Sequence, residues 1–199
     1  MKSNSRSKNT GAKKSSAKSS SKTNSSSSSE ESGAFRELFI DGLKDIYWAE
    51  KALAKALPKI ASKVANDELK DAIENHISET KDQISRLEQI FEVLGEKAEG
   101  KKCEAMLGLI KEADEIISET EEGSVRDAGI ILATQKIEHY EIATYGTLGT
   151  FARILSEHDA VALLEDTLSE EKNADETLSQ IAESVVNMEA LEEQDQDEE

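Results

Sequence analysis

The sequence is poor in the residues that bend, cross-link or interrupt regular structure. It contains one proline and one cysteine among 199 residues, and aromatic side chains make up only 4% of the chain. The lone Cys103 cannot form an intramolecular disulfide, which suits a reducing compartment. Because helix-forming residues are abundant and proline is almost absent, long helices are expected rather than sheets.

Long hydrophobic runs are also missing. No stretch approaches the roughly 20 apolar residues that span a bilayer, and the N-terminus has no apolar segment typical of a secretory signal. We therefore expect a cytoplasmic protein with no membrane contact. The chain also lacks a glycine-rich phosphate loop, a Ser/His/Asp order typical of hydrolases and the Cys/His spacing of zinc sites, so none of these sites is predicted.

Positive charge is scarce outside the N-terminal segment. The formal net charge is −18, yet residues 1–29 hold seven basic side chains and no acidic one, so the rest carries 17 basic and all 42 acidic residues. Such an acidic body should repel nucleic acid and attract cations. Residues 1–33, rich in Ser and Lys, predict a disordered arm that aids solubility, with DNA contact as the alternative. Residues 189–199 predict a solvated acidic tail.

Helical periodicity is strong between the two charged ends. Apolar residues recur at alternating steps of three and four, which is the spacing of one helix face. The predicted helices cover residues 34–65, 67–94, 103–120, 125–156 and 158–187. Four long helices and one short helix make an all-α bundle over residues 34–188, with a kink expected at Pro58.

Each long helix places a glutamate on its apolar face, close to the middle of the helix. These residues are Glu50, Glu79, Glu138 and Glu171. A single glutamate in such a position usually lies at the edge of the face and reaches water. Antiparallel helices of similar length bring their midpoints to one height, however, because each residue rises about 1.5 Å. The four glutamates are therefore expected to meet in one layer of the core.

Three of these glutamates have a second carboxylate one helical turn away. The partners are Asp82, Glu141 and Asp175, and spacings of three and four place such pairs on one face. Buried like charges would repel strongly and take up protons unless cations neutralised them. Two divalent ions would do so, and carboxylates suit Fe(II), Mn(II), Mg(II) or Ca(II). We predict that all seven carboxylates form one metal site.

Three further side chains lie within a turn of the predicted ligands. His76 precedes Glu79 on the same face, either as a core histidine that bonds a carboxylate or as a ligand itself. Tyr47 and Tyr145 could donate hydrogen bonds to ligands, although packing with a satisfied hydroxyl explains them as well.

The chain resembles the YciE/YciF family of ferritin-like, stress-associated bacterial proteins over residues 36–185. The segments that carry this resemblance are Asp45–Glu50 (DIYWAE), His76–Thr80 (HISET), Arg86–Phe91 (RLEQIF), Cys103–Met106 (CEAM), Glu138–Gly146 (EHYEIATYG) and Glu170–Asp175 (EEKNAD). The resemblance implies a ferritin-like four-helix bundle with the short helix in its crossover, and a homodimer.

The chain is also similar to rubrerythrin-type di-iron sites. That likeness implies iron, with manganese as the alternative, on Glu50, Glu79, Glu138, Glu141 and Glu171. The wider pattern has histidines where this chain has aspartates, at positions 82 and 175. The departure implies a harder site made entirely of oxygen ligands, and it weakens the case for redox chemistry.

Two functional hypotheses follow. The first is a di-metal oxidoreductase of the ferroxidase or peroxidase kind, in which oxygen or peroxide is reduced and oxidative damage is limited. The second is a non-catalytic stress or structural bundle, in which the metal is structural or absent.

Overall fold

The structure is a computed structural model that describes residues 25–197, and within this range it is helical with no strand. The elements are α1 (Ser25–Ala61), α2 (Asp67–Val93), α3 (Glu104–Glu119), α4 (Ser124–Leu155), α5 (His158–Ile181), a π-helical segment η1 (Ala182–Val186) and α6 (Asn187–Asp197). The all-α bundle with four long helices and one short helix is therefore confirmed.

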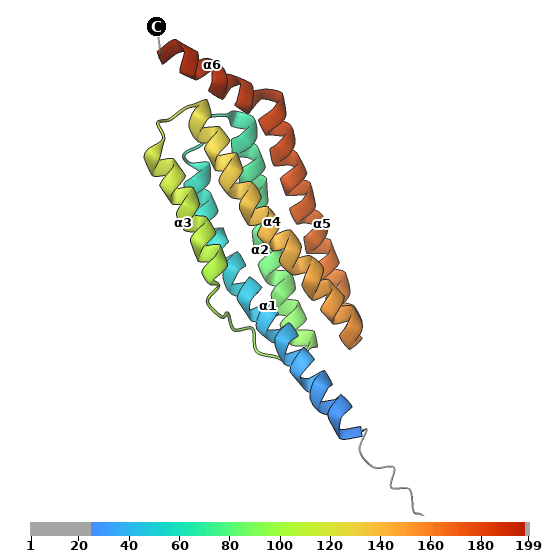
Figure 1. The fold of residues 1–199 in the computed structure, drawn as a ribbon. Coiled ribbons are helices and arrows are strands. Elements are labelled where there is room, and N and C mark those ends of the chain that lie inside the picture. The colour runs from blue at the N-terminus through green and yellow to red at the C-terminus, as the bar shows by residue number, and fades with distance from the viewer. Residues whose placement is uncertain (1–24, 198–199) are drawn as a thin grey trace, which may run out of the picture.

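The four long helices form the bundle, and α3 packs beside it. Short turns join α1 to α2 and α4 to α5, so each of these pairs is antiparallel (Figure 1). Helix α1 contacts α2 and α4, and α5 contacts the same two helices from the opposite side. The crossover from α2 to α4 carries α3 along α1 and α4. This is the ferritin-like arrangement expected from the sequence.

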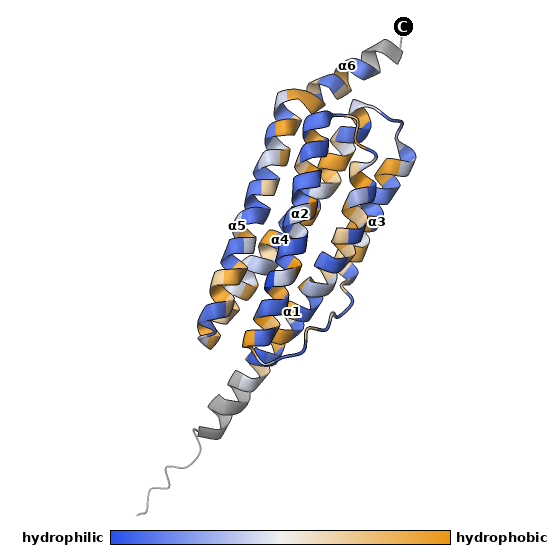
Figure 2. Ribbon diagram, turned by 180° about the vertical axis from the view of Figure 1, so that it is seen from behind, coloured by the Kyte–Doolittle hydropathy of each residue, from blue (hydrophilic) through white to orange (hydrophobic). Residues whose placement is uncertain are grey.

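Each helix is amphipathic rather than uniformly apolar (Figure 2). The core is built mainly from aliphatic side chains, including the fully buried Leu43, Ile46, Leu53 and Leu57 of α1. Their spacing of three and four turns one stripe of α1 inward. Glu50 lies within this same stripe, so the packing that buries the leucines also buries a carboxylate.

The predicted helix boundaries hold within a few residues, except at the ends of the chain. Asn66 caps α2 by accepting a hydrogen bond from the Leu69 backbone N–H at 3.0 Å, and Gly95 follows that helix with a φ of 68°. Helix α1 continues through Pro58 and begins at Ser25 rather than at residue 34. Residues 1–24 of the predicted arm lie outside the described residues.

The acidic segment predicted as a solvated tail is helical as far as Asp197 and contacts the bundle. Gly123 precedes α4 and has no side chain that could cap the helix. Instead, the Glu193 carboxylate of α6 accepts hydrogen bonds from the backbone N–H groups of Ser124 at 2.8 Å and Val125 at 3.3 Å. A negative side chain is favourable there because a helix N-terminus carries partial positive charge.

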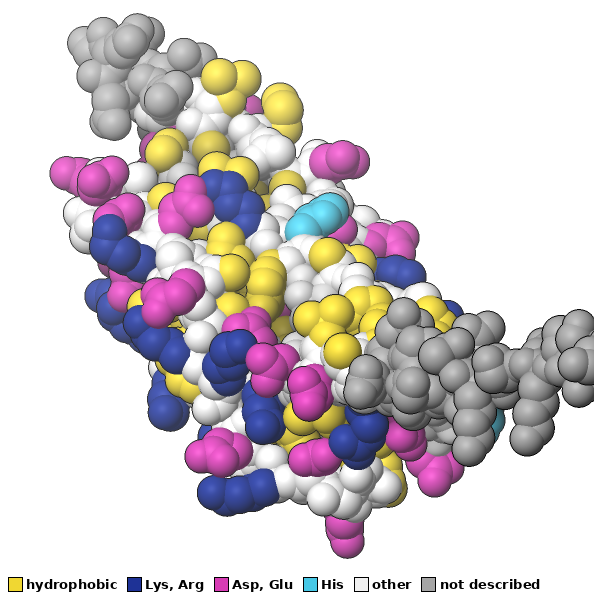
Figure 3. Space-filling model, turned by 60° about the horizontal axis from the view of Figure 1, so that its bottom comes forward, with side chains coloured by type: hydrophobic (Ala, Val, Ile, Leu, Met, Phe, Trp, Pro, Cys, Tyr) yellow, Lys and Arg dark blue, Asp and Glu magenta, His cyan; other side chains and the backbone are white. Residues whose placement is uncertain are grey.

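The surface mixes both signs of charge. On the face shown in Figure 3, acidic and basic side chains are interspersed with small hydrophobic patches. Among the described helices, none combines the length and hydropathy needed to cross a membrane.

Candidate metal centre

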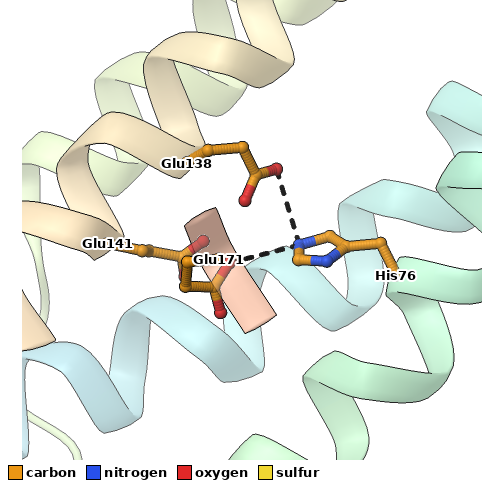
Figure 4. Close-up of side chains that lie close together, drawn as sticks. All are labelled: His76, Glu138, Glu141 and Glu171. Atoms are coloured by element: carbon orange, nitrogen blue, oxygen red, sulfur yellow. Dashed lines mark ion pairs between the residues drawn. The ribbon is translucent and has the colours of Figure 1, made fainter. Parts of the chain in front are cut away.

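Four acidic or imidazole side chains converge in the middle of the bundle. His76 of α2, Glu138 and Glu141 of α4 and Glu171 of α5 each offer a ligand atom, and these atoms all lie within 4.8 Å of one another. The His76 Nε2 atom lies 3.5 Å from a Glu138 oxygen and 3.9 Å from a Glu171 oxygen (Figure 4). All four residues are buried, and Glu138 and Glu171 are two of the four mid-helix glutamates that were expected to share one layer.

Glu50 of α1 completes the carboxylate layer. It is fully buried, and the charges of Glu171 and Glu170 raise the pKa of its carboxyl beyond the effect of burial. The Tyr145 hydroxyl of α4 donates a hydrogen bond to a Glu50 oxygen at 2.5 Å. Burial and the nearby charge of Glu50 raise the pKa of Tyr145, so this hydroxyl keeps its proton and remains a donor.

A second polar contact orients Glu171. The Gln83 amide on α2 donates to a Glu171 oxygen at 2.5 Å and to Glu170 at 3.2 Å. Glu170 also accepts hydrogen bonds from Arg86, which in addition donates to the Thr167 hydroxyl at 3.0 Å. Arg86 is thus paired with Glu170 rather than with the carboxylates of the layer.

The buried carboxyls favour their protonated forms when no cation is present. Burial raises the pKa of Glu50, Glu138 and Glu141 well above the usual range. The charge of Glu171 raises the pKa of Glu50 and Glu138 further, and the charge of Glu50 does the same for Glu141. Burial also raises the pKa of Glu171, an effect that His76 opposes. The layer therefore has a strong affinity for positive charge.

Many buried polar atoms of this layer have no hydrogen-bond partner. Throughout the described chain, the buried side-chain oxygen and nitrogen atoms without a hydrogen-bond partner all belong to this site: Glu50 Oε2, His76 Nε2, Gln83 Oε1, Glu138 Oε2, both Glu141 oxygens and Glu171 Oε2. Each such atom costs about 1–3 kcal/mol when it stays unsatisfied, and native folds rarely gather several in one place. Carboxylate oxygens and one imidazole nitrogen are ligands that transition metals accept, so these residues could hold a metal ion.

The other predicted ligands lie at the edge of this group or outside it. Glu79 is partly exposed, and its carboxylate is 3.4 Å from His76 Nδ1. Asp175 is 23% exposed and accepts a hydrogen bond from Gln135 at 3.2 Å, with His139 3.3 Å away. Asp82 is exposed and lies outside the group. On α2 the inward position after Glu79 belongs to residue 83, so residue 82 is rotated about 100° away from the site.

The three side chains predicted to lie near the ligands differ in whether they contact the site. The Nε2 atom of His76 has no hydrogen-bond partner and lies 3.5 Å from a Glu138 oxygen and 3.9 Å from a Glu171 oxygen. His76 is therefore close enough to these carboxylates to act as a metal ligand itself. The hydrogen bond predicted from Tyr145 to a ligand is present. That from Tyr47 is not, because its hydroxyl donates instead to Glu88 of α2 at 2.7 Å. The hydrogen bond from Gln83 to Glu171 was not predicted from the sequence.

Replacing Tyr145 with Phe should destabilise the metal-free protein by about 1–3 kcal/mol, because the buried Glu50 carboxyl loses its donor. Urea melts of the metal-free variant would measure the loss. Tyr47→Phe is the matched control, and its effect should be smaller because Glu88 is exposed and can bond to water. Equal losses in the two variants would contradict a special role for the Tyr145 hydroxyl.

Comparison with known proteins places the chain in a family. A family described as a domain of unknown function, DUF892, matches residues 34–191. Protein YciF of Escherichia coli K12 is 47% identical over 155 residues, which cover 77% of this chain and 93% of YciF.

Solved structures agree with this placement. The crystal structure of the E. coli stress protein YciF superposes with a TM-score of 0.74 and covers 77% of this chain and 97% of that one. The protein YcfI of Rhodopseudomonas palustris is 44% identical, with a TM-score of 0.73 over 74% of this chain and 94% of YcfI. The resemblance to the YciE/YciF proteins is thereby confirmed, and the chain belongs to the DUF892 family.

Proposed function

We propose that this protein holds two divalent metal ions, iron first and manganese as the alternative, and uses them to reduce oxygen or peroxide under stress. The observation that carries the proposal is the set of buried, unpartnered ligand atoms in one layer of the core. Glu50, Glu138, Glu141, Glu171 and His76 would be the ligands. Four carboxylates offer four negative charges, which two divalent ions would balance.

His76 favours a transition metal over magnesium or calcium. A site made only of oxygen ligands suits the harder ions, whereas an imidazole nitrogen beside carboxylates suits iron. His76 lies one turn before Glu79, while the rubrerythrin-type pattern carries its histidine one turn after the glutamate. The imidazole would thus take over the role left open by Asp82.

The chain's own groups fix two of the ligands in place. Tyr145 holds Glu50 and Gln83 holds Glu171, so neither carboxylate rotates freely when a metal ion leaves or enters. The aliphatic core surrounds the layer, and burial strengthens its interactions with cations. Bound ferrous ions would supply the electrons for reducing oxygen or peroxide.

The stress connection comes from the related E. coli protein, which is described as a stress protein. The R. palustris relative is instead described as a candidate structural protein, so a structural bundle is the second candidate function. Its distinguishing feature would be metal that binds without being oxidised.

Iron oxidation separates the two candidates. Full-length protein given Fe(II) in air should consume it at least about tenfold faster than buffer alone, as ferrozine sampling over time would show. The Glu138→Gln variant should lose most of this rate because one ligand charge is removed. Asp82→Asn makes the same chemical change at the exposed position on α2 and should retain the rate. A wild-type rate equal to that of buffer would favour the structural candidate.

A further inference from the structure

A cavity of about 380 Å³ opens beside the carboxylate layer, and the proposed reduction of oxygen or peroxide does not account for its size. A water molecule occupies about 30 Å³, and oxygen or hydrogen peroxide is little larger. The cavity is instead within the size range of pockets that bind small organic molecules.

The cavity runs from the surface of the bundle to the metal centre. Asn75 and Ser78 of α2 and Asn173 of α5 are exposed and form its mouth. At its inner end are His76 and Glu138, both buried and both part of the carboxylate layer. A molecule that fills this cavity would therefore place one end against the site.

Small residues keep the cavity open. Ala72 of α2 and Ala174 of α5 both line it, while Leu57, Ile73 and Leu178 form apolar walls. Toward the C-terminal end of α2, by contrast, the hydrogen bonds from Arg86 to Glu170 and Thr167 join α2 to α5. The opening is thus confined to the stretch where alanines and short polar side chains face each other.

The charges of the lining restrict the ligand. No Lys or Arg is among the residues that line the cavity, whereas Glu79 and Glu138 both are. In the metal-free protein, carboxylates and phosphates would be repelled there, because no basic side chain lines the cavity to bind them. The lining instead offers apolar walls and, at the inner end, the hydrogen-bonding groups of His76 and Glu138. This suits an uncharged organic molecule that places one polar end there.

We propose that this cavity binds uncharged organic hydroperoxides, with the hydroperoxyl group at His76 and Glu138 and the organic body against Leu57, Ile73 and Leu178. The proposal rests on the function proposed above, because it names the peroxide that the site reduces. Reduction of ROOH to ROH and water breaks the O–O bond and takes up two protons and two electrons. The electrons would come one each from two ferrous ions.

Binding can be tested without turnover. The probe is 2-phenyl-2-propanol, the uncharged alcohol product of cumene hydroperoxide, and benzoate serves as an anion of similar size. Calorimetric titration would use the full chain, both metal-free and loaded with redox-inert Zn(II). The alcohol should bind in both states, and in the metal-free protein benzoate should bind about tenfold more weakly or not at all.

Filling the cavity should weaken binding. Ala174→Leu should weaken binding of the alcohol by about tenfold or more, because the added side chain occupies the cavity. Ala162→Leu makes the same change at an exposed position of α5 outside the lining and should bind as wild type does. Ala72→Leu is the second cavity variant if Ala174→Leu does not fold, with circular dichroism as the criterion of folding.

Turnover gives a second readout. With iron bound, the ratio of the rate with cumene hydroperoxide to the rate with hydrogen peroxide should fall about tenfold in the cavity variants. Lack of alcohol binding to the wild type, benzoate binding as tight as alcohol binding in the metal-free protein, or an unchanged affinity in both cavity variants would overturn the assignment. Metal-free protein that binds the alcohol but takes up no metal would instead overturn the proposed function and leave the cavity site in place.

Discussion

Replacing Glu141 with Gln is expected to reduce the bound metal from about two divalent ions per chain to one or fewer. Both Glu141 oxygens are buried and without a hydrogen-bond partner. The substitution keeps the shape of the side chain, but it removes one of the four buried negative charges. Plasma mass spectrometry after Fe(II) or Mn(II) loading and desalting measures the stoichiometry.

The same loading should stabilise the wild-type protein. Two independent sites at a free metal concentration about 100-fold above their dissociation constants would add about 5 kcal/mol in total. A thermal melt with and without metal should therefore show a midpoint shift of about 10 °C or more for a chain of this size.

Asp82→Asn is the control for this prediction. It exchanges a carboxylate for an amide on α2, as Glu141→Gln does on α4, but its side chain is exposed. Metal content and midpoint shift should both match the wild type. Near-zero metal in the wild type, or an equal loss in the two variants, would refute the site.

Metal-free protein should become more stable as the pH falls from about 7 toward 5. Glu50, Glu138 and Glu141 have folded-state pKa values well above the usual range because they are buried near one another. Between the unfolded pKa, about 4.3 for glutamate, and the raised folded value, the folded state binds more protons. The free energy of unfolding therefore rises as the pH is lowered through this window and falls as the pH increases.

Glu138→Gln tests the origin of this trend. With one buried charge removed, the metal-free variant should be about 1–3 kcal/mol more stable than wild type at pH 7. Its stability should also depend less steeply on pH, since one of the groups with a raised pKa is gone. Surface charges contribute equally to both proteins, so the difference between them isolates the buried layer.

Bound metal should reverse the pH trend, because ligation requires deprotonated carboxylates. Urea melts at several pH values, with and without metal, measure all of these effects. If Glu138→Gln lowers metal-free stability at pH 7 and metal changes neither protein, the carboxylate layer is a structural hydrogen-bond network.

The sequence by itself determined the fold class and the existence of the carboxylate layer. Steps of three and four between apolar residues define helix faces without reference to any partner helix. Glu50, Glu138 and Glu171 lie on those faces near the middle of their helices, so antiparallel packing had to bring them to one level. Local signals such as Asn66 and Gly95 were also sufficient to place the ends of α2.

The tertiary structure alone decided which neighbours of these glutamates belong to the site. Residues 82 and 83 differ by one step of about 100° on α2, and only the direction of the core relative to that helix turns Gln83 inward and Asp82 to solvent. Similarly, Tyr47 and Tyr145 each lie close to a glutamate in sequence. Only Tyr145 reaches a glutamate of the carboxylate layer, whereas Tyr47 bonds Glu88 of α2; a tyrosine hydroxyl lies far from its own backbone, so its partner depends on the packing of another helix.

The contacts of the C-terminal segment were likewise decided by the tertiary structure alone. Its composition is that of a solvated acidic tail, and nothing local predicts a binding partner for it. Glu193 finds the N-terminus of α4 because the fold brings these two parts of the chain together across 69 residues of sequence. Helix patterns and mid-helix glutamates are local information. The rotation of each helix about its axis and contacts between distant segments arise only when the whole bundle packs.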